Sequence, residues 1–359
     1  ARDEEQLKQY EYHQIILDEA QNIKNPRAKA AQVVRQLKAR HRLCLTGTPM
    51  ENHLGELWAL FYFLMPGFLY SQEIFNKKYR HPIEKRGDQQ LRQKLVNRIK
   101  PFILRRLKTD VAKELPEKTT IEVNIDMNDQ QSKLYEAVRA TMQENIQKIV
   151  AEKGFKRSQI QILDALLKLR QVCCHPSLLK LDSVKTGQAH SAKLEQLMDM
   201  VVPMVEEGRK ILIFSQFTSM LELIEQQLHH AEIGYVKLTG KTKKRDEVIT
   251  AFQSGQVPVF LISLKAGGVG LNLTAADTVI HYDPWWNPAA EDQASDRAWR
   301  IGQDKPVFVY KLITNKSIEE KILALQQNKA ELAQSILSTD HEGEAKLTEN
   351  DVMNLFEKF

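Results

Sequence analysis

The chain contains 359 residues, of which 42% are hydrophobic and 27% are charged, and its formal net charge is +5 at pH 7. This composition excludes an intrinsically disordered chain, and the length allows about two domains of ordinary size. The longest apolar run, 57–65, is too short to span a bilayer, and the charged first residues show no secretory signal, so we expect no membrane partner.

The first part of the chain is predicted to form a strand, a helix and a strand, at 13–17, 27–39 and 42–46. The second strand runs into a turn that contains Gly47 and Pro49. Asp18 and Glu19 follow the first strand directly, and open α/β sheets bind ligands at the carboxyl ends of their strands.

A long helical region separates these strands from the second half of the chain. Helical and basic segments are expected from 54 to 113, an alternating strand at 119–125 (TTIEVNI), and helical spacing again from 130 to 170. The polar stretch 180–192 has no strong period and is the predicted domain boundary.

The second half alternates more regularly. Helices are predicted at 192–207, 220–230 and 244–253, and strands at 210–214, 235–238, 257–263, 278–282 and 307–312. This order predicts a parallel sheet with helices on both faces. A last helical region, 317–337, is expected to brace this body through Ile318, Ile322, Leu325 and Leu332.

The stretch 260–303 carries a candidate anion-binding helix. Asn287 can cap a helix and Pro288 suits its first position, so we predict a helix at 289–300 that Gly302 ends. Helical spacing then places Gln293, Arg297 and Arg300 on one face. Such a face suits a phosphate, because arginine stabilises the charge that develops during phosphoryl transfer. A solvated polar face is the alternative interpretation.

Asp18 and Glu19 are the candidate acidic pair. An aspartate and a glutamate after a buried strand can hold Mg²⁺ through the first carboxylate and orient or deprotonate water with the second. Taken alone, such a pair is also typical of a helix N-terminus or a solvated loop.

The loop 235–245 (YVKLTGKTKKR) places a glycine, Lys241 and Thr242 between a strand and a helix, as phosphate loops do. The spacing does not fit, because the first glycine of a Walker loop would fall at Tyr235. Contacts with a nucleic-acid backbone are the preferred interpretation, and a solvated basic loop is the alternative. Past the strand at 257–263, the glycines of 265–270 (KAGGVG) would let backbone amides approach a phosphate.

Cysteines and tryptophans give weaker signals. Cys173, Cys174 and Cys44 are expected to lie in cores rather than to bind a metal, and three cysteines form no disulfide framework. Trp285 and Trp286 could stack on a base, or serve in packing.

Taken together, seven ordered blocks resemble the SWI/SNF-type ATPases, a branch of the superfamily 2 helicases that translocate on double-stranded DNA. The blocks are DEAQNIKN (18–25), LTGTPMEN (45–52), FILRRLKTDVAKELPEK (102–118), LRQVCCHP (169–176), KILIFSQF (210–217), LTGKTKKR (238–245) and the stretch 260–303. The resemblance implies an α/β fold with two RecA-like lobes, parallel sheets and helical insertions, and ATP bound in the cleft between the lobes.

The resemblance also implies domain bounds. Residues 1–126 would be the remainder of the first lobe with part of its helical insertion, and 127–180 the helical insertion. Residues 181–192 would form a linker, 193–316 the second lobe, and 317–359 a C-terminal helical brace and tail.

By the same resemblance, Asp18 would bind Mg²⁺ through water and Glu19 would be the catalytic base. Gln293 and Gly268 would face ATP, with Arg297 and Arg300 as catalytic arginine fingers. The residues that would couple hydrolysis to DNA or grip its backbone are Thr46, Thr48, Lys241, Thr242, Ser263 and Lys265.

One departure from the family pattern is large. The Walker loop would precede the strand that leads to Asp18 and Glu19, and only seventeen residues, that strand included, precede Asp18 here. The chain therefore resembles the C-terminal part of a longer enzyme, and alone it is expected neither to bind ATP tightly nor to hydrolyse it. The DEAQNIKNP block and the compact second lobe resemble bacterial members.

The leading hypothesis is an ATP-dependent motor on duplex DNA of the chromatin- or nucleoprotein-remodelling type. We expect a monomer that acts with a DNA-bound protein complex, in the bacterial nucleoid or the eukaryotic nucleus. Two alternatives remain at this stage: a non-catalytic DNA- or protein-binding module, and an RNA helicase of the same superfamily.

Overall fold

The computed structural model describes residues 2–47, 53–106, 108–179, 190–267, 270–324, 326–327 and 353–359. The chain divides into two compact units: Ala1–Arg105 with Gln327–Lys346, and Arg106–Gln326 with Leu347–Phe359. The predicted α/β class with parallel sheets is confirmed, and every described strand pair is parallel.

The first unit begins with α1 (Glu4–Leu7) and contains a parallel pair of strands, β1 (Glu11–Leu17) and β2 (Lys38–Cys44), joined through α2 (Lys29–Gln36). The predicted helix 27–39 is too long, since Lys38 already pairs with Glu11 in the ladder. Lysine, alanine and arginine at 38–40 favour helices locally, but pairing with β1 outweighs this preference.

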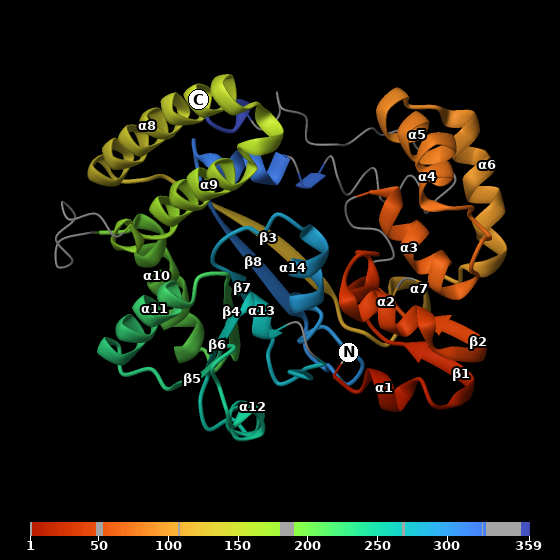
Figure 1. Ribbon diagram of the computed structural model, residues 1–359. Helices are drawn as coiled ribbons and strands as arrows, with labels where there is room; N and C mark the ends of the chain where they lie inside the picture. Colours follow the sequence, from red (N-terminus) through yellow and green to blue (C-terminus); the bar gives the residue numbers. More distant parts are fainter. Residues whose placement is uncertain are drawn as a thin grey trace. The chain divides into compact units, whose positions relative to one another are not determined.

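Helices and helical turns make up most of the described residues from 54 to 102 (Figure 1). They are α3 (Leu54–Leu64), α4 (Gln72–Phe75), the π-turn Asn76–Arg80, α5 (His81–Arg86) and α6 (Gln89–Ile99), followed by the 3₁₀ turn Lys100–Phe102. Ser71 and Asp88 cap α4 and α6 by accepting hydrogen bonds from backbone amides. Apolar residues of α3 to α6 share one core that includes Trp58, Phe61 and Phe75.

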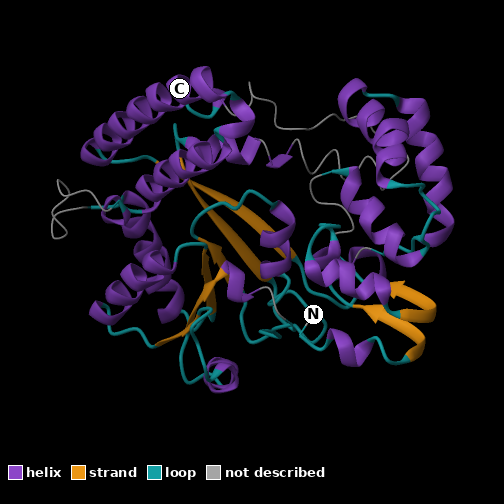
Figure 2. Ribbon diagram, viewed as in Figure 1, coloured by secondary structure: helices purple, strands orange, loops and turns teal. Residues whose placement is uncertain are grey.

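The second unit contains a six-stranded parallel sheet in the order β3-β8-β7-β4-β6-β5. Figure 2 draws its strands in orange. Its strands are β3 (Lys118–Ile125), β4 (Ile211–Ser215), β5 (Tyr235–Leu238), β6 (Val259–Ser263), β7 (Thr278–His281) and β8 (Val307–Thr314). Strands β4, β6 and β7 are buried along their whole length. Continuous apolar runs such as ILIFS are typical of strands covered on both faces.

Helices cover both faces of this sheet, as predicted. On one face Ile211 and Ile213 pack against α10 (Ala192–Glu206) and α11 (Thr218–His230). On the other face Leu212 and Phe214 share a core with residues of α12 (Arg245–Gln253), α13 (Leu264–Gly267) and α14 (Pro288–Ser295). Alternate residues of one strand therefore serve two cores.

The helices α8 (Asp129–Lys153) and α9 (Gln159–Cys174) form a third core in the second unit. A helical segment at 318–324 contributes Ile318 and Ile322 to it, so these two predicted brace residues pack as expected. Leu325 and Leu332 lie outside the described side chains. No described helix is long and apolar enough to cross a membrane.

The two compact units do not coincide with the predicted domain bounds, which stay a prediction. The predicted first lobe, 1–126, includes α7 (Lys108–Val111) and β3, and both belong to the second unit. The reason is pairing, because β3 forms its whole ladder with β8, from Lys118 opposite Val307 to Ile125 opposite Thr314.

Candidate functional site

The acidic pair lies where β1 ends. Asp18 is exposed, and its Oδ1 accepts a hydrogen bond of 2.9 Å from the backbone N–H of Glu19. Glu19 is half-buried and adopts a left-handed backbone conformation with φ of 49°. A non-glycine residue in that region is strained, and such strain gathers at functional sites. The 3₁₀ helix Ala20–Ile23 follows, and its buried Ala20 and Ile23 fix the turn to the core.

Gln21 connects the acidic pair to the end of β2. Its Nε2 donates to Oε2 of Glu19 at 2.6 Å, and its Oε1 accepts from the hydroxyl of Thr46 at 2.7 Å. The backbone repeats this connection, because the N–H of Ala20 donates to the carbonyl of Leu45 at 2.9 Å. Hydrogen bonds through Gln21 thus connect Glu19, the predicted catalytic base, with Thr46, a predicted coupling residue. Thr48 lies outside the described residues.

The donor set at Asp18 fits Mg²⁺. The second carboxylate oxygen of Asp18 has no partner among the described residues, and the side chain is open to solvent. Protein Mg²⁺ sites commonly use one or two carboxylates and complete the shell with water and phosphate oxygens. The described residues contain no group of three or more His, Cys, Asp or Glu side chains that could hold a metal by themselves.

In the second unit, α14 begins as predicted. The side chain of Asn287 caps the helix by accepting from the N–H of Ala289 at 3.1 Å, and Pro288 occupies the first turn. The predicted length is wrong, because α14 ends at Ser295 rather than Arg300. The amides of Arg297 and Ala298 bond three residues back, and the carbonyl of Arg297 accepts from Leu273 at 3.0 Å. This tertiary bond replaces the next helical turn.

The three predicted nucleotide residues therefore do not share a continuous helical face. Gln293 is half-buried within α14, Arg297 is buried at 7% exposure, and Arg300 is exposed. The Nη1 of Arg300 lies 3.4 Å from the carbonyl oxygen of Leu271. Asp296 forms ion pairs with Lys108 at 2.7 Å and Lys118 at 3.5 Å, so these two lysines share one carboxylate.

Two buried polar contacts hold α14 against the sheet. Oε2 of Glu291 lies 2.8 Å from Nζ of Lys311 in β8, and its Oε1 accepts from the N–H of Trp285 at 2.6 Å. One turn later, the hydroxyl of Ser295 lies 2.8 Å from Nε2 of His281 in β7. These anchors are not predicted from the sequence, in which the glutamate among the alanines of α14 is a weak signal.

The anchors shift the pKa values of their groups. Burial would raise the pKa of the Glu291 carboxyl, but His281 and Lys311 outweigh burial and hold this pKa below its ordinary value. Burial would lower the pKa of Lys311, and Glu291 outweighs it and raises that pKa. Burial lowers the pKa of His281 to about 4, because the opposing effect of the Glu291 carboxylate does not outweigh it.

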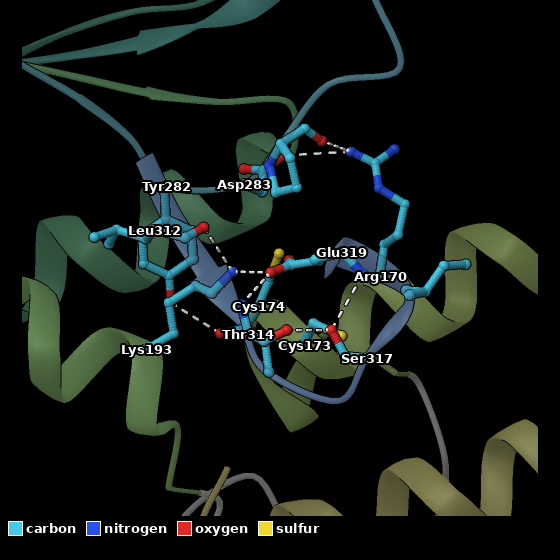
Figure 3. Close-up of polar contacts among 12 residues, drawn as sticks. Arg170, Cys173, Cys174, Lys193, Tyr282, Asp283, Leu312, Thr314, Ser317 and Glu319 are labelled. Carbon is cyan, nitrogen blue, oxygen red and sulfur yellow. Dashed lines mark hydrogen bonds and ion pairs between the residues drawn. The ribbon is translucent and has the colours of Figure 1, made fainter. Parts of the chain in front are cut away.

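A second buried network lies at the carboxyl ends of β4, β7 and β8 (Figure 3). Asp283, two residues after β7, accepts from the hydroxyl of Ser215 at 2.5 Å and lies 3.8 Å from Nη2 of Arg170. Arg170 also donates to the carbonyl of Pro284. These contacts fix the start of the loop that leads to α14, and they attach it to α9.

Lys193 and Glu319 extend this network and form an ion pair with almost no exposure, 1% and 0% for the two side chains. Lys193 also donates to the carbonyl of Leu312 at 3.3 Å, and Glu319 accepts from the N–H of Thr314 at 2.9 Å. The N-terminus of α10 and the segment 318–324 are thereby both attached to the end of β8 (Figure 3).

The basic loop after β5 is partly structural. Lys241 is exposed, whereas the hydroxyl of Thr242 accepts from the N–H of Thr239 at 2.9 Å and contacts the carbonyl of Lys237 at 3.4 Å. Ser263, the last residue of β6, is buried at 4% exposure. The side chain of Lys265 and all of Gly268 lie outside the described residues.

The remaining candidates serve in packing. Cys173 and Cys174 are buried free thiols, as predicted, and Cys44 is half-buried against a core of the first unit. Trp285 and Trp286 are half-buried, and the guanidinium of Arg170 lies 5.9 and 5.5 Å from their ring centres.

Two family models match the chain: the SNF2-related domain over residues 1–178 and the helicase conserved C-terminal domain over 192–302. A putative ATP-dependent helicase/translocase of Bacillus subtilis, YwqA, is 40% identical over 94% of this chain and 37% of its own length. An uncharacterized ATP-dependent helicase of Mycoplasma genitalium is 37% identical over 98% of this chain and 33% of its own length. The chain thus spans about a third of the length of these curated relatives.

Solved structures give the same assignment. The SWI2/SNF2 ATPase core of Sulfolobus solfataricus in complex with double-stranded DNA is 39% identical, with a TM-score of 0.52, over 93% of this chain and 70% of that one. The SWI2/SNF2 ATPase core domain of the same organism is 37% identical, with a TM-score of 0.55, over 98% of this chain and 72% of that one. Both family models, the relatives and these structures agree, and the chain belongs to the SWI2/SNF2 family of ATPases.

Proposed function

We propose that the protein is an ATP-dependent motor that moves on double-stranded DNA and remodels nucleoprotein complexes. The observation that carries this proposal is the hydrogen-bonded series Glu19–Gln21–Thr46, because it joins a candidate catalytic carboxylate to a residue of the neighbouring strand end. The similar SWI2/SNF2 ATPase core of Sulfolobus solfataricus, solved in complex with double-stranded DNA, supports duplex DNA as the substrate.

Hydrolysis of ATP would be divided among residues of both units. Asp18 would hold Mg²⁺ through water, and the ion would supply positive charge to the phosphate oxygens. Glu19 would orient and deprotonate the attacking water, and Gln21 would fix the direction of its carboxylate. In the second unit, Gln293 and Gly268 would contact the nucleotide, and Arg297 and Arg300 would stabilise the charge of the transferring phosphoryl group.

Coupling to DNA would use the strand ends. A change in the position of Glu19 reaches Thr46 through Gln21, so Thr46 and the following Thr48 would transmit the nucleotide state. The residues that would contact the DNA backbone are Lys241, Thr242, Ser263 and Lys265. Because Thr242 binds its own loop, its hydroxyl would shape the turn that presents Lys241. Contacts of this kind carry no base information, so we expect little sequence preference.

The test is directional movement by the full-length protein. A duplex that carries a third-strand oligonucleotide reports translocation when the motor displaces that strand. We expect displacement that requires ATP, together with ATP hydrolysis that duplex DNA stimulates more than single-stranded DNA or RNA. Stimulation by RNA alone would favour an RNA helicase, and tight DNA binding without hydrolysis would favour a non-catalytic module.

A further inference from the structure

In the helical part of the first unit, two cationic side chains, Lys78 and Arg98, contact the phenol of Tyr70. Nζ of Lys78 and Nη1 of Arg98 each lie 3.3 Å from the hydroxyl oxygen of Tyr70. Both cations also lie over its ring, at 4.6 and 5.0 Å from the ring centre. Tyr70 itself has a left-handed backbone with φ of 64°, an uncommon conformation for an aromatic residue.

The surrounding fold fixes this arrangement. Tyr70 lies between α3 and α4, and its carbonyl accepts from the indole N–H of Trp58 at 3.1 Å. Arg98, on α6, donates through Nη2 to the carbonyl of Phe68 at 2.7 Å and stacks on that ring. Lys78 enters from the π-turn between α4 and α5 and is exposed. Three separate segments therefore bring these groups together at the surface.

The two cations have no carboxylate partner among the described residues. Residues 73–105 contain ten lysines and arginines but only three acidic residues. Two of the three are already engaged: Glu84 binds Arg80 at 3.1 Å and the N–H of Leu54 at 2.8 Å, and Asp88 caps α6. The cations lower the pKa of the Tyr70 phenol, led by the hydrogen bond from Lys78, which shows that their field is not cancelled locally.

We propose that Lys78, Arg98 and the Tyr70 hydroxyl form a phosphate-binding site through which the helical part of the first unit holds the backbone of duplex DNA. Two fixed cations beside a hydroxyl match a phosphate, which accepts charge-assisted hydrogen bonds from several donors. The basic excess extends over α5 and α6, with Lys85, Arg86 and Lys94 exposed, so the surface suits a long polyanion rather than one small anion. The site rests on the proposed function, which supplies duplex DNA as the polyanion.

The test is the salt dependence of duplex DNA binding by the full-length protein. Each lost phosphate contact reduces the slope of log affinity against log salt by about 0.9. Lys78→Ala is expected to reduce the slope by that amount, Lys78→Arg to restore it, and Lys78→Ala with Arg98→Ala to reduce it about twice as much. The control Lys168→Ala removes a cation that is paired with Asp164 at 2.8 Å and should leave the slope unchanged.

The possible results separate this site from the proposed function. A normal slope in Lys78→Ala, with unchanged thermal unfolding, would overturn the site while leaving the motor intact. Wild-type protein that fails to bind duplex DNA would overturn both. If Lys78→Ala lost binding of polyglutamate but bound duplex DNA normally, the surface would be assigned to an acidic protein, and the proposal would be overturned. Because Arg98 has structural contacts, the decisive variants are Lys78→Ala and its rescue by arginine.

Discussion

Lys311 in β8 and Glu291 in α14 form an ion pair of 2.8 Å in which the glutamate side chain is only 1% exposed. Glu291 also accepts a hydrogen bond from the backbone of Trp285, so one carboxylate joins the loop after β7, the helix and the neighbouring strand. Because α14 carries Gln293 and ends two residues before Arg297, this pair helps to position the segment that bears those side chains.

Breaking this pair on one side is expected to destabilise the second unit. Lys311→Met leaves the Glu291 carboxylate buried without its cation, at a cost of about 3 kcal/mol in the free energy of unfolding. The double variant Glu291→Leu with Lys311→Met should recover part of that loss, because no unpaired charge remains. Urea denaturation measures both. As a control, Lys168→Met breaks an exposed pair and should cost less than about 1 kcal/mol.

Acid is expected to destabilise the protein through two buried histidines. Burial lowers the pKa of His281 and of His175 to about 4, whereas an unfolded histidine has a pKa of about 6.5. Between these values the unfolded chain binds more protons, so stability is complete above about pH 6.5 and falls as the pH falls towards 4. Each histidine should contribute a slope of about 1.4 kcal/mol per pH unit. Urea denaturation at several pH values should show a smaller slope in His281→Gln, and an unchanged slope would contradict this assignment.

Removing Gln21 is expected to separate hydrolysis from DNA movement. Gln21→Ala removes both side-chain bonds to Glu19 and Thr46, so we expect kcat for ATP to fall and fewer steps per ATP in third-strand displacement. Binding of duplex DNA should remain unchanged. The matched control is Gln14→Ala, which changes an exposed glutamine on β1, the strand that precedes the acidic pair. Equal kcat and equal displacement in Gln21→Ala and Gln14→Ala would count against the coupling role.

Arginine variants test the transition-state role of the segment after α14. Arg297→Ala in the full-length protein should reduce kcat by about 10³-fold with a small change in KM, because an arginine finger acts mainly on the transition state. Arg300→Ala should also reduce kcat. Arg157→Ala, which alters an exposed arginine in the turn between α8 and α9, serves as a control for general loss of positive charge. A loss confined to KM would assign Arg297 to ground-state binding only.

The sequence predicted the second sheet well, for a physical reason. Strands such as 211–215 and 259–263 are buried on both faces, so their apolar runs are continuous and their flanking helices are amphipathic. The start of α14 was equally predictable, since Asn287 and Pro288 are local signals for the first turn of a helix.

Long-range contacts were not predictable in the same way. The end of α14 depends on a backbone bond between Leu273 and Arg297, and the start of β2 depends on its pairing with β1. The ion pair between Arg170 and Asp283 joins α9 to the loop after β7, and no local residue spacing indicates it. The site at Tyr70 was missed because it needs three segments that only the folded helices bring together.

The most direct test of the proposed motor is steady-state ATP hydrolysis by the full-length protein with and without duplex DNA, for wild type and Glu19→Gln. We expect DNA to stimulate wild-type hydrolysis strongly, and Glu19→Gln to abolish hydrolysis while binding duplex DNA with wild-type affinity. Hydrolysis by Glu19→Gln at the wild-type rate, or a wild-type rate that duplex DNA does not change, would contradict the proposed function.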